Sequence, residues 1–187
     1  MGRGVLYGGK YENFDPATPS SSHSGGFNHG INALPYLNPL DLADPNYLIE
    51  GIVLIEPNGY CLTVHYRLNG KVKNVKCLAF RYSTDGVGST LYGTVQNCFF
   101  KVNDDGLKLY LSYSVYEDIS IFLQNNGAAF QITWNMENTP IGTFKNVLVR
   151  RVDVIRTVPA TQIRGRSIIN VGGVEGATFA DYIFEDI

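Results

Sequence analysis

The chain has 187 residues, 44% of them hydrophobic and 17% charged, which excludes an intrinsically disordered protein and suits one domain with its own core. The net charge of −2 and the lack of a basic block argue against a nucleic acid or an anionic membrane as a partner. No apolar run approaches the roughly 20 residues of a membrane span, so we expect a soluble protein.

The first part of the chain predicts little regular structure. Glycine and tyrosine are abundant, at 20 and 12 residues, which favours a β-rich fold with many turns. The segment "GRGVLYGGKY" (2–11) predicts one short strand. Residues 12–47 are dense in Pro, Ser, Asn, Asp and Gly and follow no strand or helix period, so they predict a long loop.

Five later segments predict strands of similar local form, each with apolar residues near an Asn, Asp or Glu. They are "VKNVKCLAF" (72–80), "VQNCFFKV" (95–102), "VYEDISIFL" (115–123), "FKNVLVRRVDVI" (144–155) and "FADYIFEDI" (179–187). Their starts are 23, 20, 29 and 35 residues apart, and repetition at this period indicates a solenoid. We therefore predict an all-β chain that forms one right-handed, single-stranded parallel β-helix over 1–187, with five to seven coils. No Asn-Gly hairpin between matched strands favours a sandwich or barrel.

Cysteines and histidines suggest neither a disulfide framework nor a metal site. The three cysteines, Cys61, Cys77 and Cys98, are odd in number, lack C-x-x-C spacing and lie in strand-like runs, so we expect buried free thiols. The three histidines have no acidic or cysteine cluster beside them. We predict no metal ligand and no cofactor.

Three turns share a polar residue followed by glycine. They are "RYSTDG" (81–86), "KVNDDG" (101–106) and "LQNNG" (123–127). The glycines recur at steps of 20 and 21 residues, and a glycine after Asp or Asn suits a turn that needs a positive φ. Stacked coils lie about 4.8 Å apart, so we expect Asp85, Asp105 and Asn126 to form a ladder with Asp104 beside it.

This ladder has two interpretations. Carboxylates this close resist simultaneous ionisation, so one should keep its proton near neutral pH. Hydrolysis of a glycosidic bond needs one protonated and one ionised carboxyl group, which makes Asp85, Asp104 and Asp105 candidate catalytic residues. The alternative is a set of solvated turn residues, because the third turn has the same form with neutral amides.

Further residues could line a carbohydrate cleft. Lys108 and Tyr110 alternate along one strand and should project on the same side, and Arg81 precedes the first aspartate. A lysine or arginine could keep one carboxylate ionised while its neighbour is protonated. Trp134 could stack on a sugar ring while Gln131 bonds its hydroxyls. For Lys108 a solvated strand position, and for Trp134 a place in the core, remain the alternatives.

"RYSTDG", "FFKVNDDGLKLY" and "FQITW" together resemble the catalytic β-helix of glycoside hydrolase family 49, the dextranases and isopullulanases, and "GRGVLYGGKY" resembles the start of such pectinase-like helices. The resemblance implies a secreted, inverting endo-hydrolase of an α-glucan such as dextran or pullulan. Asp104 would be the general acid, and Asp85 and Asp105 would activate water, with about 6.5–9.5 Å between acid and base. Polygalacturonases of family 28 share T-D-G and D-D motifs, but their G-H-G and R-I-K motifs are missing here.

Family members also carry an N-terminal β-sandwich and further coils. This difference leaves two alternatives, a non-catalytic carbohydrate-binding β-helix and a structural assembly module. It also leaves open a homo-oligomer formed through an uncapped end of the helix. The expected partner is therefore a polysaccharide or oligosaccharide, or a second copy of the chain.

Overall fold

A computed structural model gives the fold of residues 3–7, 31–32, 47–57, 60–63, 69–80, 84–88, 91–133, 142–156, 167–172 and 176–187. These described residues form strands and turns and no helix, so none of them belongs to a helix able to cross a membrane. The predicted all-β class is confirmed. All named strand pairings are parallel.

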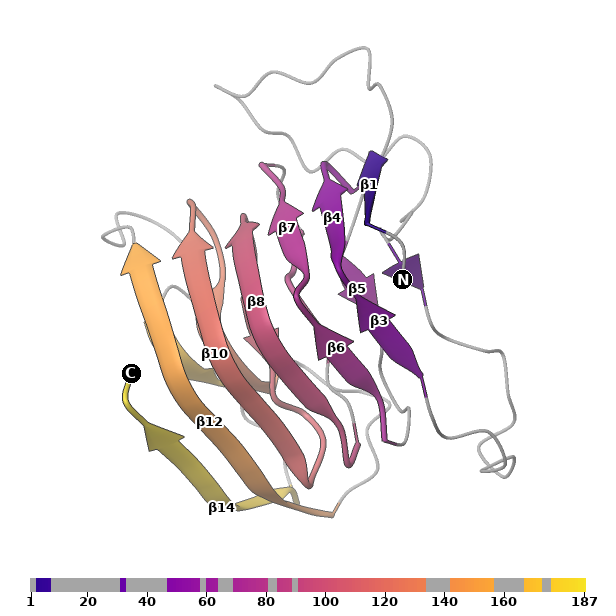
Figure 1. The fold of residues 1–187 in the computed structure, drawn as a ribbon. Helices are drawn as coiled ribbons and strands as arrows, with labels where there is room; N and C mark the ends of the chain where they lie inside the picture. The colour runs from indigo at the N-terminus through magenta and orange to yellow at the C-terminus, as the bar shows by residue number, and fades with distance from the viewer. Residues whose placement is uncertain are drawn as a thin grey trace.

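One large sheet runs through the molecule with its strands side by side (Figure 1). Its members are β1 (Gly4–Tyr7), β3 (Leu48–Glu50), β4 (Ile52–Ile55), β6 (Lys71–Lys73), β7 (Lys76–Leu78), β8 (Thr94–Val102), β10 (Ser114–Leu123), β12 (Thr143–Arg156) and β14 (Thr178–Glu185). Val72 pairs with Val95, Val95 with Tyr116, Tyr116 with Val149 and Val149 with Phe184. The first and last of these steps equal the predicted spacing of the segments, whereas the second is one residue longer and the third four residues longer than predicted.

Among the described residues, five shorter strands form a second layer. Along the chain they alternate with strands of the large sheet. They are β2 (Ile31–Asn32), β5 (Leu62–Thr63), β9 (Leu107–Lys108), β11 (Ala128–Thr133) and β13 (Ser167–Val171). Val87 bridges to both Leu62 and Leu107, which links β2 and β5 to β9, β11 and β13. β2 is a two-residue strand inside the segment 12–47 that was predicted as a long loop, and the rest of 12–46 lies outside the described residues, so the loop stays a prediction.

In β8, β10 and β12, one residue with a left-handed backbone conformation bends the strand, and the three residues occupy equivalent positions in the register. Asn97, Asp118 and Arg151 have φ of 52°, 55° and 51°. Asn74, with φ of 54°, holds the equivalent place between β6 and β7 and accepts a hydrogen bond from the Asn97 side-chain amide at 2.6 Å. Asparagine and aspartate tolerate this conformation better than other side chains. The bend also reverses which alternate residues face inward.

The core lies between the two layers. Val95, Phe100 and Ile121 of the large sheet and Leu107 and Phe130 of the shorter strands are fully buried there. Burial of such apolar side chains is the main favourable term in folding. The last strands, β13 and β14, leave apolar side chains exposed, among them Ile169 and Ile183. Self-association through this end stays a prediction.

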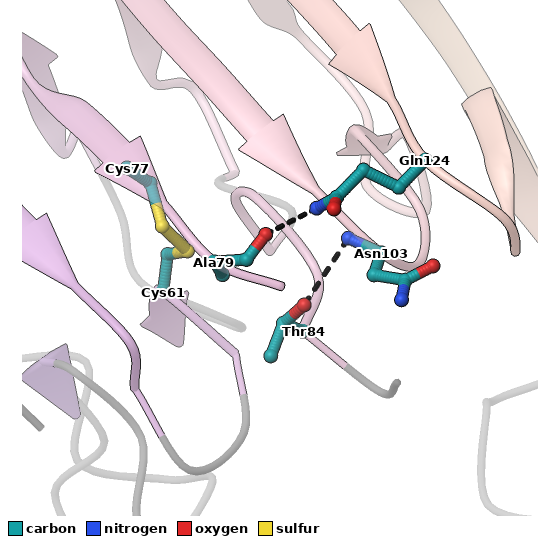
Figure 2. Close-up of a disulfide and its surroundings, with 6 residues drawn as sticks. All are labelled: Cys61, Cys77, Ala79, Thr84, Asn103 and Gln124. Carbon is teal, nitrogen blue, oxygen red and sulfur yellow. Dashed lines mark hydrogen bonds between the residues drawn. A yellow bond between two sulfur atoms is a disulfide. The ribbon is translucent and has the colours of Figure 1, made fainter. Parts of the chain in front are cut away.

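The cysteine prediction is wrong for two of the three residues. Cys61 and Cys77 form a disulfide with their Cα atoms 6.2 Å apart, which joins the start of β5 to β7 (Figure 2). Sequence spacing could not reveal this contact, because it depends on how the two layers face each other. Cys98 is a buried free thiol as expected, and burial raises its pKa to about 11.

Candidate active site

Two aspartates come into register at the start of the shorter strands. Val87 pairs with Leu107, so Asp85 and Asp105, each two residues earlier, occupy equivalent positions in neighbouring levels. The preceding level places Tyr60 there. Parallel strands lie about 4.8 Å apart, so this register brings the side chains together, as predicted for the first two members of the ladder.

The third member of the predicted ladder is wrong. The pairing of β9 with β11 places Ala128, not Asn126, beside Asp105, and the Ala128 backbone N–H donates to Asp105 Oδ1 at 3.0 Å. Asn126 instead donates from its amide to Asp104 Oδ2 at 2.9 Å. The third turn is therefore displaced by two residues, and its amide contacts the other aspartate.

The three turn glycines are needed for two different reasons. A Cβ on Gly86 would lie 2.3 Å from the Gly106 carbonyl oxygen, and one on Gly106 would lie 2.8 Å from the Ala129 carbonyl oxygen. Of the three, Gly127 has the positive φ that was expected of all, +81°, and its Cβ would also lie 2.2 Å from the Asp104 carbonyl carbon. Close backbone contact between levels, more than turn geometry, requires glycine at the first two positions.

Buried polar side chains fix the backbone just before the aspartates. Asn103, 1% exposed, donates from its backbone N–H to Thr84 Oγ1 at 3.1 Å (Figure 2). Its amide donates to the Phe80 carbonyl at 2.8 Å, and its Oδ1 accepts from the Asn125 N–H at 2.9 Å. One side chain thus connects three levels of the chain immediately before Asp104.

Lys108 joins the two aspartates that lie in register. Its Nζ is 2.7 Å from Asp85 Oδ1 and 2.8 Å from Asp105 Oδ2, and it donates to the Tyr110 hydroxyl at 3.3 Å. The two carboxylates and the ammonium group are almost fully buried, whereas Asp104 is partly exposed. One oxygen from each of Asp85, Asp104 and Asp105 lies within 4.8 Å of the others.

The environment gives the carboxyl groups of Asp104 and Asp85 different pKa values. Burial raises the pKa of Asp104 to about 8, and the negative charges of Asp85 and Asp105 add to the rise. Burial raises the pKa of Asp85 to about 6, although the neighbouring Lys108 opposes this. Near pH 7 the cluster therefore contains a protonated Asp104 beside an ionised Asp85, which are the two forms that acid and base catalysis require.

The same three carboxylates are close enough to share a hard divalent cation. Lys108 already lies between Asp85 and Asp105, and a proton already neutralises Asp104. An ammonium at this position repels a metal ion, so the chemistry of the donor set fits acid and base catalysis better than metal binding.

The remaining predicted site residues differ in their placement. Gln131 is 1% exposed, donates to the Thr133 carbonyl and accepts from the Asn170 amide at 2.8 Å. Its amide is thus engaged inside the protein at both ends, on the strand position next to Lys108. Trp134 and Arg81 lie outside the described residues.

Sequence reasoning missed Tyr60, Asn103 and Asn170. The Tyr60 ring centroid lies 5.1 Å from Lys108 Nζ, and a signal for it existed in "GYCL" (59–62), which aligns with "TDGV" (84–87). Asn103 precedes the aspartate pair but carries no motif. Asn170 belongs to a level with no matching turn in sequence, so only the pairing of β11 with β13 places it near the site.

The fold and the cluster define an all-β protein of parallel strands that carries a buried carboxylate and lysine site. No protein-family model matches the chain. It is 30% identical over 146 residues to a dextranase of Arthrobacter sp. strain CB-8, an alignment that covers 73% of the chain and 22% of that protein. It is 27% identical over 163 residues to an isopullulanase of Aspergillus niger, covering 82% and 27%, and 27% identical over 145 residues to a dextranase of Arthrobacter globiformis, covering 73% and 22%.

These matches confirm a distant relationship to dextranases and isopullulanase. The chain spans about a quarter of the length of the curated relatives that it matches.

Proposed function

We propose that this chain carries the catalytic site of a glycoside hydrolase that cleaves internal bonds of an α-glucan such as dextran or pullulan. The observation that supports the proposal is the cluster in which Asp104, whose pKa burial raises to about 8, lies beside two carboxylates bound by one lysine. The names of the distant relatives supply the substrate class.

We further propose that the strands are coils of a right-handed, single-stranded parallel β-helix. The chain alternates between the two layers, and the strands within each layer pair in parallel. Crossover connections between parallel strands are right-handed in nearly all proteins.

In the proposed reaction, Asp104 gives its proton to the glycosidic oxygen as the bond from that oxygen to the anomeric carbon breaks. A water molecule forms the new bond to the anomeric carbon and passes its proton to an ionised carboxylate. The products are two shorter glucans, and exchange with solvent restores the starting protonation of both carboxyl groups.

Asp85 is the better candidate for the base. Both oxygens of Asp105 already accept hydrogen bonds, one from Lys108 and one from the Ala128 N–H. The pKa of about 6 at Asp85 lies near neutral pH, where a general base is most effective. Asp105 then lies beside the reacting sugar as a second carboxyl group held by Lys108.

Inversion at the anomeric carbon, which the family resemblance implies, needs its own test. The closest carboxyl oxygens lie within 4.8 Å of one another, whereas inverting enzymes usually separate the two groups by about 6.5–9.5 Å. Proton NMR of the first product will distinguish the outcomes, because inversion of an α-linked glucan releases the β-anomer before mutarotation.

The hydrolase proposal is tested by incubating the protein with dextran, pullulan and polygalacturonate between pH 4 and pH 9. We expect reducing ends from an α-glucan, and an Asp104→Asn variant should keep its fold while turnover falls by about 10²–10⁴-fold. Asp153→Asn, at an exposed aspartate of β12 in the other sheet, is the matched control and should keep full activity. Release of reducing ends from polygalacturonate alone would favour a polygalacturonase instead. No reducing ends from any of the three polymers would refute the hydrolase proposal.

A non-catalytic carbohydrate-binding β-helix is the second candidate, because the chain spans only about a quarter of its relatives. This function predicts glucan binding that Trp134→Ala abolishes and Asp104→Asn leaves unchanged. Isothermal titration with dextran oligosaccharides, combined with the turnover assay, separates the two candidates.

A further inference from the structure

Lys108 was predicted to bind substrate, but its ammonium group has a different set of partners. An ammonium has three N–H donors. Among the described residues, Nζ lies within hydrogen-bond distance of Asp85 Oδ1 at 2.7 Å, Asp105 Oδ2 at 2.8 Å and the Tyr110 hydroxyl at 3.3 Å. A sugar hydroxyl could accept from Lys108 only by displacing one of these groups.

Aromatic rings shield this ion-pair network from water. The ring centroids of Tyr60 and Tyr110 lie 5.1 and 5.5 Å from Lys108 Nζ. The side chains of Lys108, Asp85 and Asp105 are 6%, 3% and 8% exposed. Solvent therefore screens the attraction only weakly, and the ammonium acts strongly on both carboxylates.

The two ion pairs of Lys108 distinguish between adjacent aspartates. Its ion pairs within the described part of the chain are with Asp85 and Asp105, whereas Asp104 contacts the Asp105 N–H at 3.0 Å and the Asn126 amide at 2.9 Å. In the described part of the chain, the titratable groups that act on the ammonium are Asp85, Asp105, Tyr110 and Tyr60, and Asp104 belongs to the same carboxylate cluster.

We propose that Lys108 is a positioning residue that holds the carboxyl groups of Asp85 and Asp105 side by side as its ion-pair partners and so leaves Asp104 as the carboxyl group that holds the proton. This inference rests on the proposed function for the meaning of that proton. The arrangement itself is a property of the free protein, which can be measured without substrate.

The test is a titration of the protein labelled with ¹³C at the aspartate side-chain carboxyl carbons, followed by NMR from pH 4 to pH 10. Single Asp→Asn variants assign the three signals. In Lys108→Met, which keeps the length of the side chain and removes its charge, we expect the titration of Asp85 to move upward by about one to three pH units, because Lys108 lowers the pKa of Asp85. Lys108→Arg keeps the charge and should leave the titration of Asp85 near its wild-type position.

An unchanged titration of Asp85 in Lys108→Met would overturn the proposal. If that variant does not fold, the wild-type protein still decides the question through the ¹⁵N and ¹H signals of the Lys108 ammonium. We expect these signals to exchange slowly with water and to keep their shifts when a dextran oligosaccharide is added at saturation. Fast exchange, or a large shift on adding the oligosaccharide, would make Lys108 a substrate ligand instead.

Activity gives a second readout once hydrolysis is established. Lys108→Met should lower kcat with little change in KM, and should move the acidic limb of the pH profile upward by about one to three units. A higher KM with an unchanged pH profile would contradict the positioning role. Failure of the titration refutes the role of Lys108 alone, whereas failure to release reducing ends refutes the proposed function alone.

Discussion

The protonation states of the carboxylate cluster predict a bell-shaped dependence of activity on pH. Asp104 must hold a proton, and its pKa of about 8 sets the basic limb. Asp85 must be ionised, and its pKa of about 6 sets the acidic limb. Two such limbs place the optimum near pH 7, where about four fifths of the molecules have the active protonation.

The fraction of active molecules falls to roughly one tenth at pH 5 and at pH 9. The assay is kcat/KM for dextran in buffers of constant ionic strength, because salt alters the interactions between the charges. A rate that declines already between pH 4 and pH 6 would refute Asp104 as the proton donor. A rate that stays level from pH 7 to pH 10 would refute it equally.

The same proton has a consequence for stability that does not depend on catalysis. Because the pKa of Asp104 rises on folding from 3.8 to about 8, its contribution to stability is full below pH 4 and is lost as the pH approaches and passes 8. Asp104→Asn removes this dependence. We measure the free energy of unfolding in urea for both proteins. As the pH rises from 5 to 9, this free energy should increase in the variant relative to the wild-type protein by on the order of a few kcal/mol.

Three further predictions concern the fold. Reduction of the Cys61–Cys77 disulfide, which closes a loop with a sequence separation of 16, should lower the free energy of unfolding by about 3 kcal/mol in urea, and equal midpoints for the oxidised and reduced protein would contradict the cross-link. Gly86→Ala should lower the free energy of unfolding by about 1–3 kcal/mol through overpacking and should therefore lower Tm, whereas Gly4→Ala, with nothing within 4 Å of the new Cβ, should leave Tm unchanged. Asn97→Ala should lower the free energy of unfolding by about 1–2 kcal/mol and Asn97→Gly by much less, because the φ of 52° favours glycine over alanine. Equal losses in the two variants would instead assign the effect to the side-chain hydrogen bond with Asn74.

The repeating strands could be predicted from sequence because the same force shapes each level. Apolar side chains must face the core in every strand of the large sheet, and this requirement fixes the strands and part of their register. Observed pairings such as Val72 with Val95 and Phe144 with Phe179 match the predicted spacing of the segments. The pairing of Asp85 with Asp105 was predictable for the same reason, since Val87 and Leu107 face the core two residues later.

The third turn shows where local similarity misleads. "LQNNG" looks like "VNDDG", so the two glycines were aligned, but register is decided by the buried Leu107 and Phe130 rather than by turn residues. Aligning those two apolar residues would have given the correct step. The disulfide had no such signal, because Cys61 and Cys77 belong to different layers and their contact depends on the geometry between layers.

The displaced third turn also explains how two adjacent aspartates acquire different roles. Since Ala128 stacks on Asp105, its backbone N–H and the Lys108 ammonium bind the two oxygens of that carboxyl group. Asn126, displaced from that column, contacts Asp104, which has no ion pair with Lys108 and faces two negative neighbours. A turn in strict register would have placed the Asn126 amide on Asp105. The shift of two residues therefore gives the adjacent residues Asp104 and Asp105 different contacts. Three turns in identical register would not produce this difference.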